Sequence, residues 1–377
     1  MTTSASHLRS STTHRTPLYD RHVALGGRMV DFGGWDLPQQ YTSIRDEHLA
    51  VRKAAGLFDV SHMGRFRVTG SESFDFLQGI VTNDLGRIKS GTAQYNLLCK
   101  DDGGIVDDLI VYWGDEAFFV VVNASNREKD LAWMQDHAPT GVQIEDQTFE
   151  LALIALQGPK AEELMPSTGL QDLPYFGFRA GEVAGVAGMI SRTGYTGEDG
   201  FEIFVPSDRV GEVWDAILER GRTDGALPAG LGARDAARLE AALRLYGNDM
   251  DETVNPYEAG LGWAVKLEKD FVGRDALAKV RQDGPRRTLV GIKTKPGDIP
   301  RHGAAVIGDA SRSGQVTSGT HSFFLGHPIA LAMVEVPSFR VGDRVAVEVR
   351  GREAEAEVVR LPFYRGSARS AVAPAKS

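Results

Sequence analysis

Apolar residues recur at helical spacing in several segments of the chain. Ser43 is followed three residues later by Asp46, a spacing similar to a capping box. Ile44, Val51 and Ala55 then fall on one helical face. The same kind of pattern predicts further helices over residues 125–137, 207–221, 232–246 and 274–281.

Short apolar runs between these helices predict strands. The predicted strands cover residues 64–69, 105–113, 117–123, 151–157 and 201–205. After about residue 270 the pattern changes, because beyond one helix the chain alternates between polar and apolar residues in short segments separated by Gly, Pro and Asp turns. These segments are 289–293, 315–318, 329–336, 344–349 and 353–358. They predict a small antiparallel barrel or sandwich at the end of the chain.

Length and composition indicate a globular protein of two or three domains. The chain has 377 residues, which is too long for one ordinary hydrophobic core. Its hydrophobic fraction of 42% is that of a globular protein. No apolar run approaches the roughly 18 residues of a membrane helix, so we expect a soluble protein. The single cysteine, Cys99, excludes an intramolecular disulfide and favours a reducing compartment. A net charge of −9, with acids and bases interspersed, argues against a nucleic-acid binder.

The first sixteen residues contain no acid and are rich in Ser, Thr, Arg and His. They resemble a transit peptide but lack an apolar helical stripe, so residues 1–15 are predicted to be a disordered tail, as are residues 367–377.

The chain has no phosphate loop, no strand-coupled Gly-x-Gly-x-x-Gly and no His or Cys pair at metal-ligand spacing. We therefore expect no metal and no nucleotide cofactor, and His62 is interpreted as structural.

A glycine-rich loop is the most informative segment. Gly194, Gly197 and Gly200 lie within seven residues and precede a strand in which Glu202 stands between apolar neighbours. A planar ligand with adjacent N–H donors would match this carboxylate. A hairpin with an exposed glutamate has the same pattern.

Two adjacent acids, Asp107 and Asp108, stand in an otherwise apolar strand after a Gly-Gly turn. Because strand residues alternate between faces, the two carboxylates point to opposite sides of the sheet. At least one should be poorly solvated, which raises its pKa and makes it a catalytic candidate. The alternative is that both acids are solvated at the beginning of the strand.

Three further residues are candidates on local grounds. Arg234 lies in the first turn of a predicted helix, where a cation opposes the helix dipole, so an anionic ligand would explain it; a solvated charge is the default for it and for Arg238. Met63 and Trp263 stand beside glycines, which suits a slot for a flat ring. Ordinary core packing explains both equally well.

Taken in order, these segments resemble the aminomethyltransferase family, the T-protein of the glycine cleavage system. The resemblance extends from about residue 16 to residue 364, and the ordered set makes it specific. The matching motifs are Thr16-Pro17-Leu18-Tyr19, Phe58-Asp59-Val60-Ser61-His62-Met63, Gly103-Gly104 through Leu109-Ile110-Val111, Leu156-Gln157-Gly158-Pro159, Gly194-Tyr195-Thr196-Gly197-Glu198, residues 230–240 and residues 245–252.

The resemblance implies a reaction and a set of site residues. The one-carbon unit of an aminomethyl group on lipoylated H-protein would pass to tetrahydrofolate, giving 5,10-methylenetetrahydrofolate, ammonia and dihydrolipoyl H-protein. Asp108 would be the catalytic acid, with Asp107 a neighbour facing away, and Glu202 would bind the pterin ring. Phe119 stands where some members have Tyr, so that hydroxyl is absent here. The other positions that would surround the folate are Met63, Tyr95, Val121, Tyr195, Arg234 and Trp263.

The resemblance also implies an α+β fold, a three-lobed ring around a folate channel with two lobes of antiparallel sheets and helices and a C-terminal antiparallel β-barrel or jelly-roll-like domain. The expected limits are 16–59 with 148–247 for the first lobe, 60–147 for an inserted second lobe carrying Asp108, and 248–366 for the third. The expected location is the cytoplasm, or the mitochondrial matrix if the N-terminal tail is a transit peptide. A monomer is compatible with the sequence.

Other members of the superfamily supply alternatives. A non-catalytic folate-binding scaffold or an iron–sulfur assembly factor would share the fold, but the assembly factors use a Lys-Gly-Cys motif that this chain lacks. Relatives fused to a flavin dehydrogenase need a dinucleotide domain, for which 377 residues leave no room. For the acidic H-protein we expect a local basic patch, and the candidates for it are Arg286, Arg287, Lys293, Lys295 and Arg301.

Overall fold

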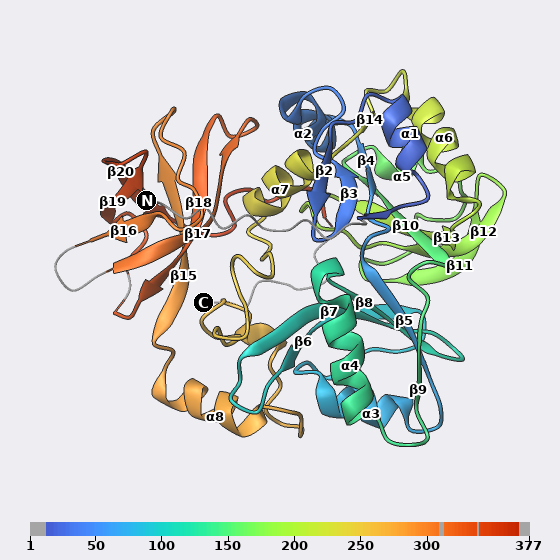
Figure 1. Cartoon of the computed structure of the whole chain (residues 1–377), viewed down its shortest axis with the longest axis horizontal. Helices are drawn as coiled ribbons and strands as arrows, with labels where there is room; N and C mark the ends of the chain where they lie inside the picture. Colours follow the sequence, from blue (N-terminus) through green and yellow to red (C-terminus); the bar gives the residue numbers. More distant parts are fainter. Residues whose placement is uncertain (1–12, 309–312, 338, 369–377) are drawn as a thin grey trace, which may run out of the picture.

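The computed structural model describes residues 13–308, 313–337 and 339–368. In Figure 1 these residues form three bodies arranged around a common centre, with a barrel on one side and two sheet-and-helix lobes on the other. Among the described residues no helix is long and apolar enough to cross a membrane.

The first body is a six-stranded sheet packed against helices. Its strands, in spatial order, are β11 (Phe178–Val183), β12 (Val186–Ser191), β13 (Gly200–Pro206), β10 (Leu151–Gln157), β4 (Gly56–Asp59) and β14 (Leu227–Pro228). Its helices are α1 (Tyr19–Ala24), α2 (Ile44–Lys53), α5 (Ala161–Leu164), α6 (Val210–Gly221) and α7 (Leu231–Glu240). A small sheet of β1 (His14–Arg15), β3 (Trp35–Pro38) and β2 (Met29–Phe32) lies beside it. Phe201, Ile203 and Val205 of β13 pack against Trp214 of α6 in the core.

The second body is a five-stranded sheet covered on one face by two helices (Figure 1). Its strands, in spatial order, are β6 (Thr92–Cys99), β7 (Ile105–Trp113), β8 (Phe118–Val122), β5 (Gly64–Thr69) and β9 (Gln143–Asp146). The helices are α3 (Ser73–Ile80) and α4 (Arg127–His137), with 3-10 turns η1 (Leu85–Arg87) and η2 (Ala124–Asn126). Leu109 and Val111 of β7 point toward these helices and pack with Leu77 and Met134.

The third body is a closed six-stranded barrel. Its strands, in order, are β15 (Arg287–Thr294), β18 (His327–Glu335), β17 (Ser313–Ser322), β16 (Ala305–Ile307), β19 (Arg344–Val349) and β20 (Arg352–Val359). The 3-10 turn η3 (Gly262–Ala264) and helix α8 (Arg274–Asp283) precede it.

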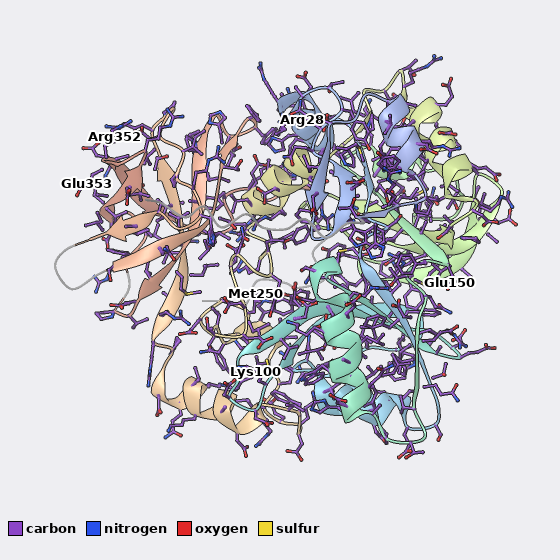
Figure 2. All side chains as sticks on the ribbon, in the orientation of Figure 1. Arg28, Lys100, Glu150, Met250, Arg352 and Glu353 are labelled. Carbon is purple, nitrogen blue, oxygen red and sulfur yellow. The ribbon has the colours of Figure 1, made fainter. Side chains whose placement is uncertain are left out.

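Two apolar clusters join the three bodies. Phe58 and Phe204 of the six-stranded sheet pack with Tyr112 and Val121 of the five-stranded sheet. Met250, which Figure 2 shows near the middle of the molecule, is 1% exposed and belongs to a cluster that spans the five-stranded sheet and the barrel. The bodies are therefore held together by buried apolar contacts.

The predicted fold class and barrel are confirmed. The strands predicted at residues 64–69, 105–113, 151–157 and 344–349 have those bounds. Helix α2 begins as predicted, because the Ser43 side chain accepts a hydrogen bond from the Asp46 backbone N–H at 3.0 Å. Several elements lie outside the predicted ones: strands β1, β2, β3, β4, β9, β11, β12, β14 and β16 and helices α1, α3 and α5.

Two predicted helices are shorter than expected. Helix α6 begins at Val210 rather than at residue 207. Helix α7 ends at Glu240 instead of continuing to residue 246, and Ala242 has a positive φ of 53°. Tertiary hydrogen bonds replace the helical ones there: Asp249 accepts from the Leu245 backbone N–H at 2.9 Å.

The predicted tails lie mostly outside the described residues, but their inner ends are ordered. His14 and Arg15 pair with β3, and the His14 ring lies 5.1 Å from that of Trp35. Ser367 and Ala368 are hydrogen-bonded to the glycine-rich loop. Aromatic and backbone contacts thus extend the ordered chain beyond the limits that composition suggested. The predicted lobe limits stay a prediction.

Candidate functional site

Asp108 lies half-buried on β7, on the face of the five-stranded sheet that is turned away from α3 and α4. Its carboxylate accepts hydrogen bonds from the Tyr95 hydroxyl at 3.0 Å and from Asn123 Nδ2 at 2.7 Å. Burial, and then the charge of Asp107, raise the pKa of Asp108 to about 7. This carboxyl can therefore take up or release a proton near neutral pH.

Asp107 points to the opposite face and is fully buried. It accepts from the Asn123 backbone N–H at 3.1 Å, from Asn123 Nδ2 at 2.8 Å and from Asn126 Nδ2 at 2.8 Å. Neither acid is freely solvated at the start of the strand, so that alternative is wrong. The sequence pattern did not single out Asn123, which only the pairing of β7 with β8 brings beside both acids.

Glu202 lies half-buried on β13, on the same face as Phe204, which packs toward the five-stranded sheet. Its Oε2 accepts from Thr193 Oγ1 at 2.5 Å and from the Tyr112 hydroxyl at 3.4 Å. No donor of the described residues reaches Oε1. Glu202 is therefore held through one oxygen while the other is available to an external donor, which an exposed hairpin glutamate would not be.

Arg234 and Tyr195 form a cation–π pair. The guanidinium lies over the Tyr195 ring, 4.7 Å from its centroid, and makes no hydrogen bond or ion pair with the described residues. Burial lowers the pKa of Arg234 and raises that of Tyr195. The Tyr195 hydroxyl donates to the backbone carbonyl of Arg244. An arginine whose guanidinium has no anionic partner among the described residues is suited to binding an anionic ligand.

Arg238, one turn further on, has a different role. It is buried and pairs with Asp249 at 2.6 Å and Asp235 at 2.7 Å, and it donates to Ser318 Oγ of the barrel at 2.8 Å. The expectation of a solvated charge is wrong for this residue.

Trp263 is the exposed member of the candidate set, with 53% of its surface accessible. Its ring stacks on Tyr95 with centroids 5.5 Å apart. Burial and the charge of Asp108 raise the pKa of Tyr95, so its hydroxyl keeps the proton that it donates to Asp108. Trp263 therefore connects the surface to the catalytic candidate through one aromatic contact.

Met63, Phe119 and Val121 form an apolar wall beside the polar groups. Val121 is buried and the other two are half-buried, and all three belong to the cluster between the two sheets. Phe119 pairs with Tyr112 across the sheet. The structure thus places an apolar surface next to Glu202 and its partner Tyr112, the combination typical of sites for a flat heterocycle.

Electrostatic coupling shows which candidates the structure brings together. The charges of Asp108 and Arg234 both act on Tyr195, and that of Glu202 acts on Arg234. Tyr112 and Thr193, which complete the surroundings of Glu202, were missed as site residues, although both occur in the segments that drew attention.

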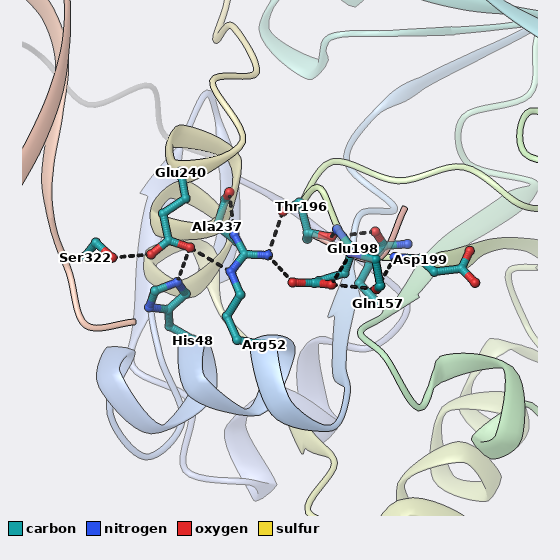
Figure 3. Close-up of polar contacts among 10 residues, drawn as sticks. His48, Arg52, Gln157, Thr196, Glu198, Asp199, Ala237, Glu240 and Ser322 are labelled. Carbon is teal, nitrogen blue, oxygen red and sulfur yellow. Dashed lines mark hydrogen bonds and ion pairs between the residues drawn. The ribbon is translucent and has the colours of Figure 1, made fainter. Parts of the chain in front are cut away.

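A buried ion network holds the glycine-rich loop in place (Figure 3). Arg52 of α2 donates to Glu240 at 2.7 Å, to Glu198 at 2.9 Å and to the backbone carbonyls of Thr196 at 2.8 Å and Ala237 at 2.9 Å. Each of its three guanidinium nitrogens donates at least one of these bonds, and its side chain is fully buried. The loop is therefore fixed to α2 and α7 by charge-assisted hydrogen bonds.

The end of the described chain joins the same network. Ser367 donates to Glu198 Oε2 from its backbone N–H at 2.8 Å and from Oγ at 2.6 Å, and Ala368 N–H donates to the Gly197 carbonyl at 3.2 Å. Ser322 of β17 donates to Glu240. We call residues 364–368 the C-terminal strap.

The predicted basic patch is largely neutralised. Arg287 pairs with Glu258 at 3.0 Å, Lys293 with Glu357 at 3.2 Å and Lys295 with Glu355 at 2.5 Å.

His62 is buried, and burial together with the charge of Arg234 lowers its pKa to about 3, so it is neutral. Within the described ranges no three His, Cys, Asp or Glu residues form a group that could hold a metal.

Comparison with known proteins identifies the family. Residues 18–269 match the model of the GCVT N-terminal domain, and residues 287–365 match that of the glycine cleavage T-protein C-terminal barrel domain. This chain belongs to the glycine cleavage T-protein family. Aminomethyltransferase of Bacillus subtilis is 46% identical over 93% of this chain and 99% of the relative, and that of Thermotoga maritima is 48% identical over 95% and 100%.

A solved T-protein structure has the same fold. The glycine cleavage system aminomethyltransferase T from Bartonella henselae superimposes with a TM-score of 0.88 at 33% identity, covering 95% of this chain and 100% of that chain. The family resemblance inferred from the motifs is confirmed, and the chain is an aminomethyltransferase that acts as a glycine cleavage T-protein. Nothing in the relatives or in the site favours the non-catalytic alternative.

Proposed function

We propose that the chain transfers the one-carbon unit of an aminomethyl group on lipoylated H-protein to tetrahydrofolate, with Asp108 as the catalytic acid. The observation that carries the proposal is the Asp108 carboxyl, half-buried between Tyr95 and Asn123 with a pKa of about 7. The products are 5,10-methylenetetrahydrofolate, ammonia and dihydrolipoyl H-protein. Family membership supports this reaction.

The residues present are suited to a reduced folate. A pterin offers an adjacent ring N–H and amine, and Glu202 has one carboxylate oxygen free of internal donors. Arg234 has no anionic partner among the described residues, and Met63, Phe119 and Val121 supply apolar surface. Tetrahydrofolate supplies the nucleophilic nitrogen that accepts the one-carbon unit.

The protein then has two tasks, to orient the reactants and to move a proton. Tyr95 and Asn123 fix the two oxygens of Asp108, because each donates to a different one. With a pKa near neutrality, Asp108 can hold a proton or release it to the departing amine. The Tyr95 ring, whose hydroxyl donates to Asp108, is itself held by stacking on Trp263.

Family membership also supports a proposed partner and a proposed location. Lipoylated H-protein is the proposed donor, and the cytoplasm is the proposed location, because the relatives described above are bacterial. The mitochondrial alternative rests on residues 1–15, of which 1–12 lie outside the described ranges.

The test is ammonia release from aminomethylated H-protein, with and without tetrahydrofolate. We expect Asp108→Asn to lower kcat by about 100-fold or more, because the amide keeps the shape but cannot exchange the proton, while tetrahydrofolate affinity changes by only a few fold. Asp101→Asn, which changes an exposed acid in the preceding turn, serves as the control. Equal turnover in the two variants would remove Asp108 from the reaction.

A further inference from the structure

A third carboxyl lies behind the candidate catalytic acid. Asp130 on α4 is fully buried, and neither of its oxygens receives a hydrogen bond from an N–H or O–H donor of the described residues. Its polar contact is the carboxyl of Asp107. Two carboxylates in contact repel each other when both are ionised, so such a pair is stable only when it shares a proton.

The surroundings decide which acid carries that proton. Asp107 accepts three hydrogen bonds, from the backbone and side-chain nitrogens of Asn123 and from Asn126, so both of its oxygens already face N–H donors. Asp130 has no such donors, and its neutral form can donate to Asp107. Burial, and then the charge of Asp107, raise the pKa of Asp130 to about 11.

In the part of the chain that the structure describes, no cation is hydrogen-bonded to this pair in place of the proton. Lys129, beside Asp130 on α4, directs its amine to the Val106 carbonyl at 2.7 Å, the Tyr246 hydroxyl at 3.0 Å and Glu252 at 3.3 Å. It forms no ion pair with either buried acid. The charged and titratable groups around the pair are therefore Asp108, Lys129, Tyr246 and Glu252, and none of them neutralises it by direct contact.

Asn123 transmits the state of Asp107 to Asp108. Its Nδ2 donates to Asp107 Oδ1 at 2.8 Å and to Asp108 Oδ1 at 2.7 Å, so its two hydrogens are directed to the two acids. An ionised Asp107 fixes the orientation of this amide and thereby the Asp108 carboxyl. The charge of Asp107 is also the second cause of the raised pKa of Asp108.

We propose that Asp130 is kept as the neutral acid and hydrogen-bonds to an ionised Asp107, and that this pair, through Asn123, positions Asp108 and tunes its proton exchange. Asp107 and Asp130 are positioning residues. The inference rests on the proposed role of Asp108, and it gives a role to Asp107, which the family resemblance implied to be a neighbour facing away.

One test needs no activity. At about pH 9, above the pKa of about 7 of Asp108 and below that of about 11 of Asp130, we expect Asp108 to be ionised and Asp130 to be protonated. Infrared difference spectroscopy should show the carbonyl stretch of a buried carboxylic acid that Asp130→Asn removes and Asp108→Asn leaves in place. A spectrum of Asp130→Asn identical to that of the unmodified protein in this region would overturn the proposal, even if Asp108 proved catalytic.

The kinetic test uses a pair of substitutions at one position. Asp130→Leu removes the donor and should lower kcat about tenfold or more at unchanged KM for tetrahydrofolate, whereas Asp130→Asn supplies an N–H to Asp107 and should restore most of the loss. Asp136→Asn, an exposed acid on the same helix, is the control. An Asp130→Asn variant as impaired as Asp108→Asn would show that Asp130 does not act as a neutral donor.

Substitution of Asp107 tests the electrostatic part. Because its charge raises the pKa of Asp108, Asp107→Asn should lower that pKa and move the Asp108-dependent limb of the kcat profile to lower pH by about one unit or more. A limb that stays in place, or moves to higher pH, would exclude tuning by Asp107.

Discussion

Three aspartates within one hydrogen-bonded cluster differ in their protonation because they accept hydrogen bonds from different numbers of donors. Asp107 receives three amide donors, Asp108 two donors from different residues, and Asp130 none. The same kind of side chain thus serves as the acceptor of three hydrogen bonds, as a group titrating near neutrality and as a neutral acid. Separation of pKa values by environment is how one site obtains distinct acid and base roles.

Glu202 gives a binding prediction at the residue scale. Glu202→Gln should weaken tetrahydrofolate binding by about 1–3 kcal/mol, because one pterin donor would then face an amide N–H₂ rather than an acceptor. Titration calorimetry measures this directly, with Glu182→Gln, an exposed acid of β11, as the control. Unchanged affinity would remove Glu202 from the pterin site.

The sequence predicted Asp108 and Glu202 as candidates because each acid interrupts an apolar strand, and such a break is visible in the pattern itself. Asn123 and Asp130 gave no such signal. A polar residue at the end of a strand and an acid in a helix are ordinary, and their importance depends on the register of β7 with β8 and on how α4 packs. Neither the strand register nor the packing of α4 can be read from the pattern of polar and apolar residues.

At the element scale, regular strands were predictable and the end of α7 was not. Strands such as 105–113 and 151–157 carry continuous apolar pattern, so local propensity and burial agree. Residues 241–246 have the same helix-forming composition as α7, yet side chains such as Arg244 and Asp249 take over their backbone groups. Tertiary hydrogen bonding outweighs a propensity of a few tenths of a kcal/mol per residue.

The C-terminal strap gives a prediction about the glycine-rich loop. Ser367 Oγ donates to Glu198 and accepts from the Asp199 backbone N–H at 3.1 Å, so Ser367→Ala removes two bonds from the loop. We expect faster hydrogen exchange over residues 194–199 and tetrahydrofolate binding weakened about two- to tenfold. Ser71→Ala, at an exposed serine before α3, is the matched control. Exchange rates equal to those of this control would mean that the strap does not order the loop.

At the scale of the whole molecule, the three bodies meet around buried groups contributed by all of them. One apolar cluster joins the two sheets, and another joins the five-stranded sheet to the barrel. Arg238 of α7 adds a polar connection to the barrel through Ser318 and Asp249. A site whose residues come from several bodies depends on their relative placement, which explains why the local sequence of Trp263 suited a ring slot and core packing equally well and could not decide between them.

The buried contacts of Arg238 with Asp249 and Ser318 lead to a prediction about how the molecule unfolds. Arg238→Met leaves Asp249 buried without its cation, which should cost about 3–5 kcal/mol and weaken the attachment of the barrel to α7. Calorimetry should show a lower Tm and a barrel transition separating from that of the two sheets. Arg209→Met, which breaks an exposed ion pair with Glu212, should leave the thermogram unchanged. A single transition at the original Tm in Arg238→Met would show that the apolar clusters alone couple the barrel to the rest of the molecule.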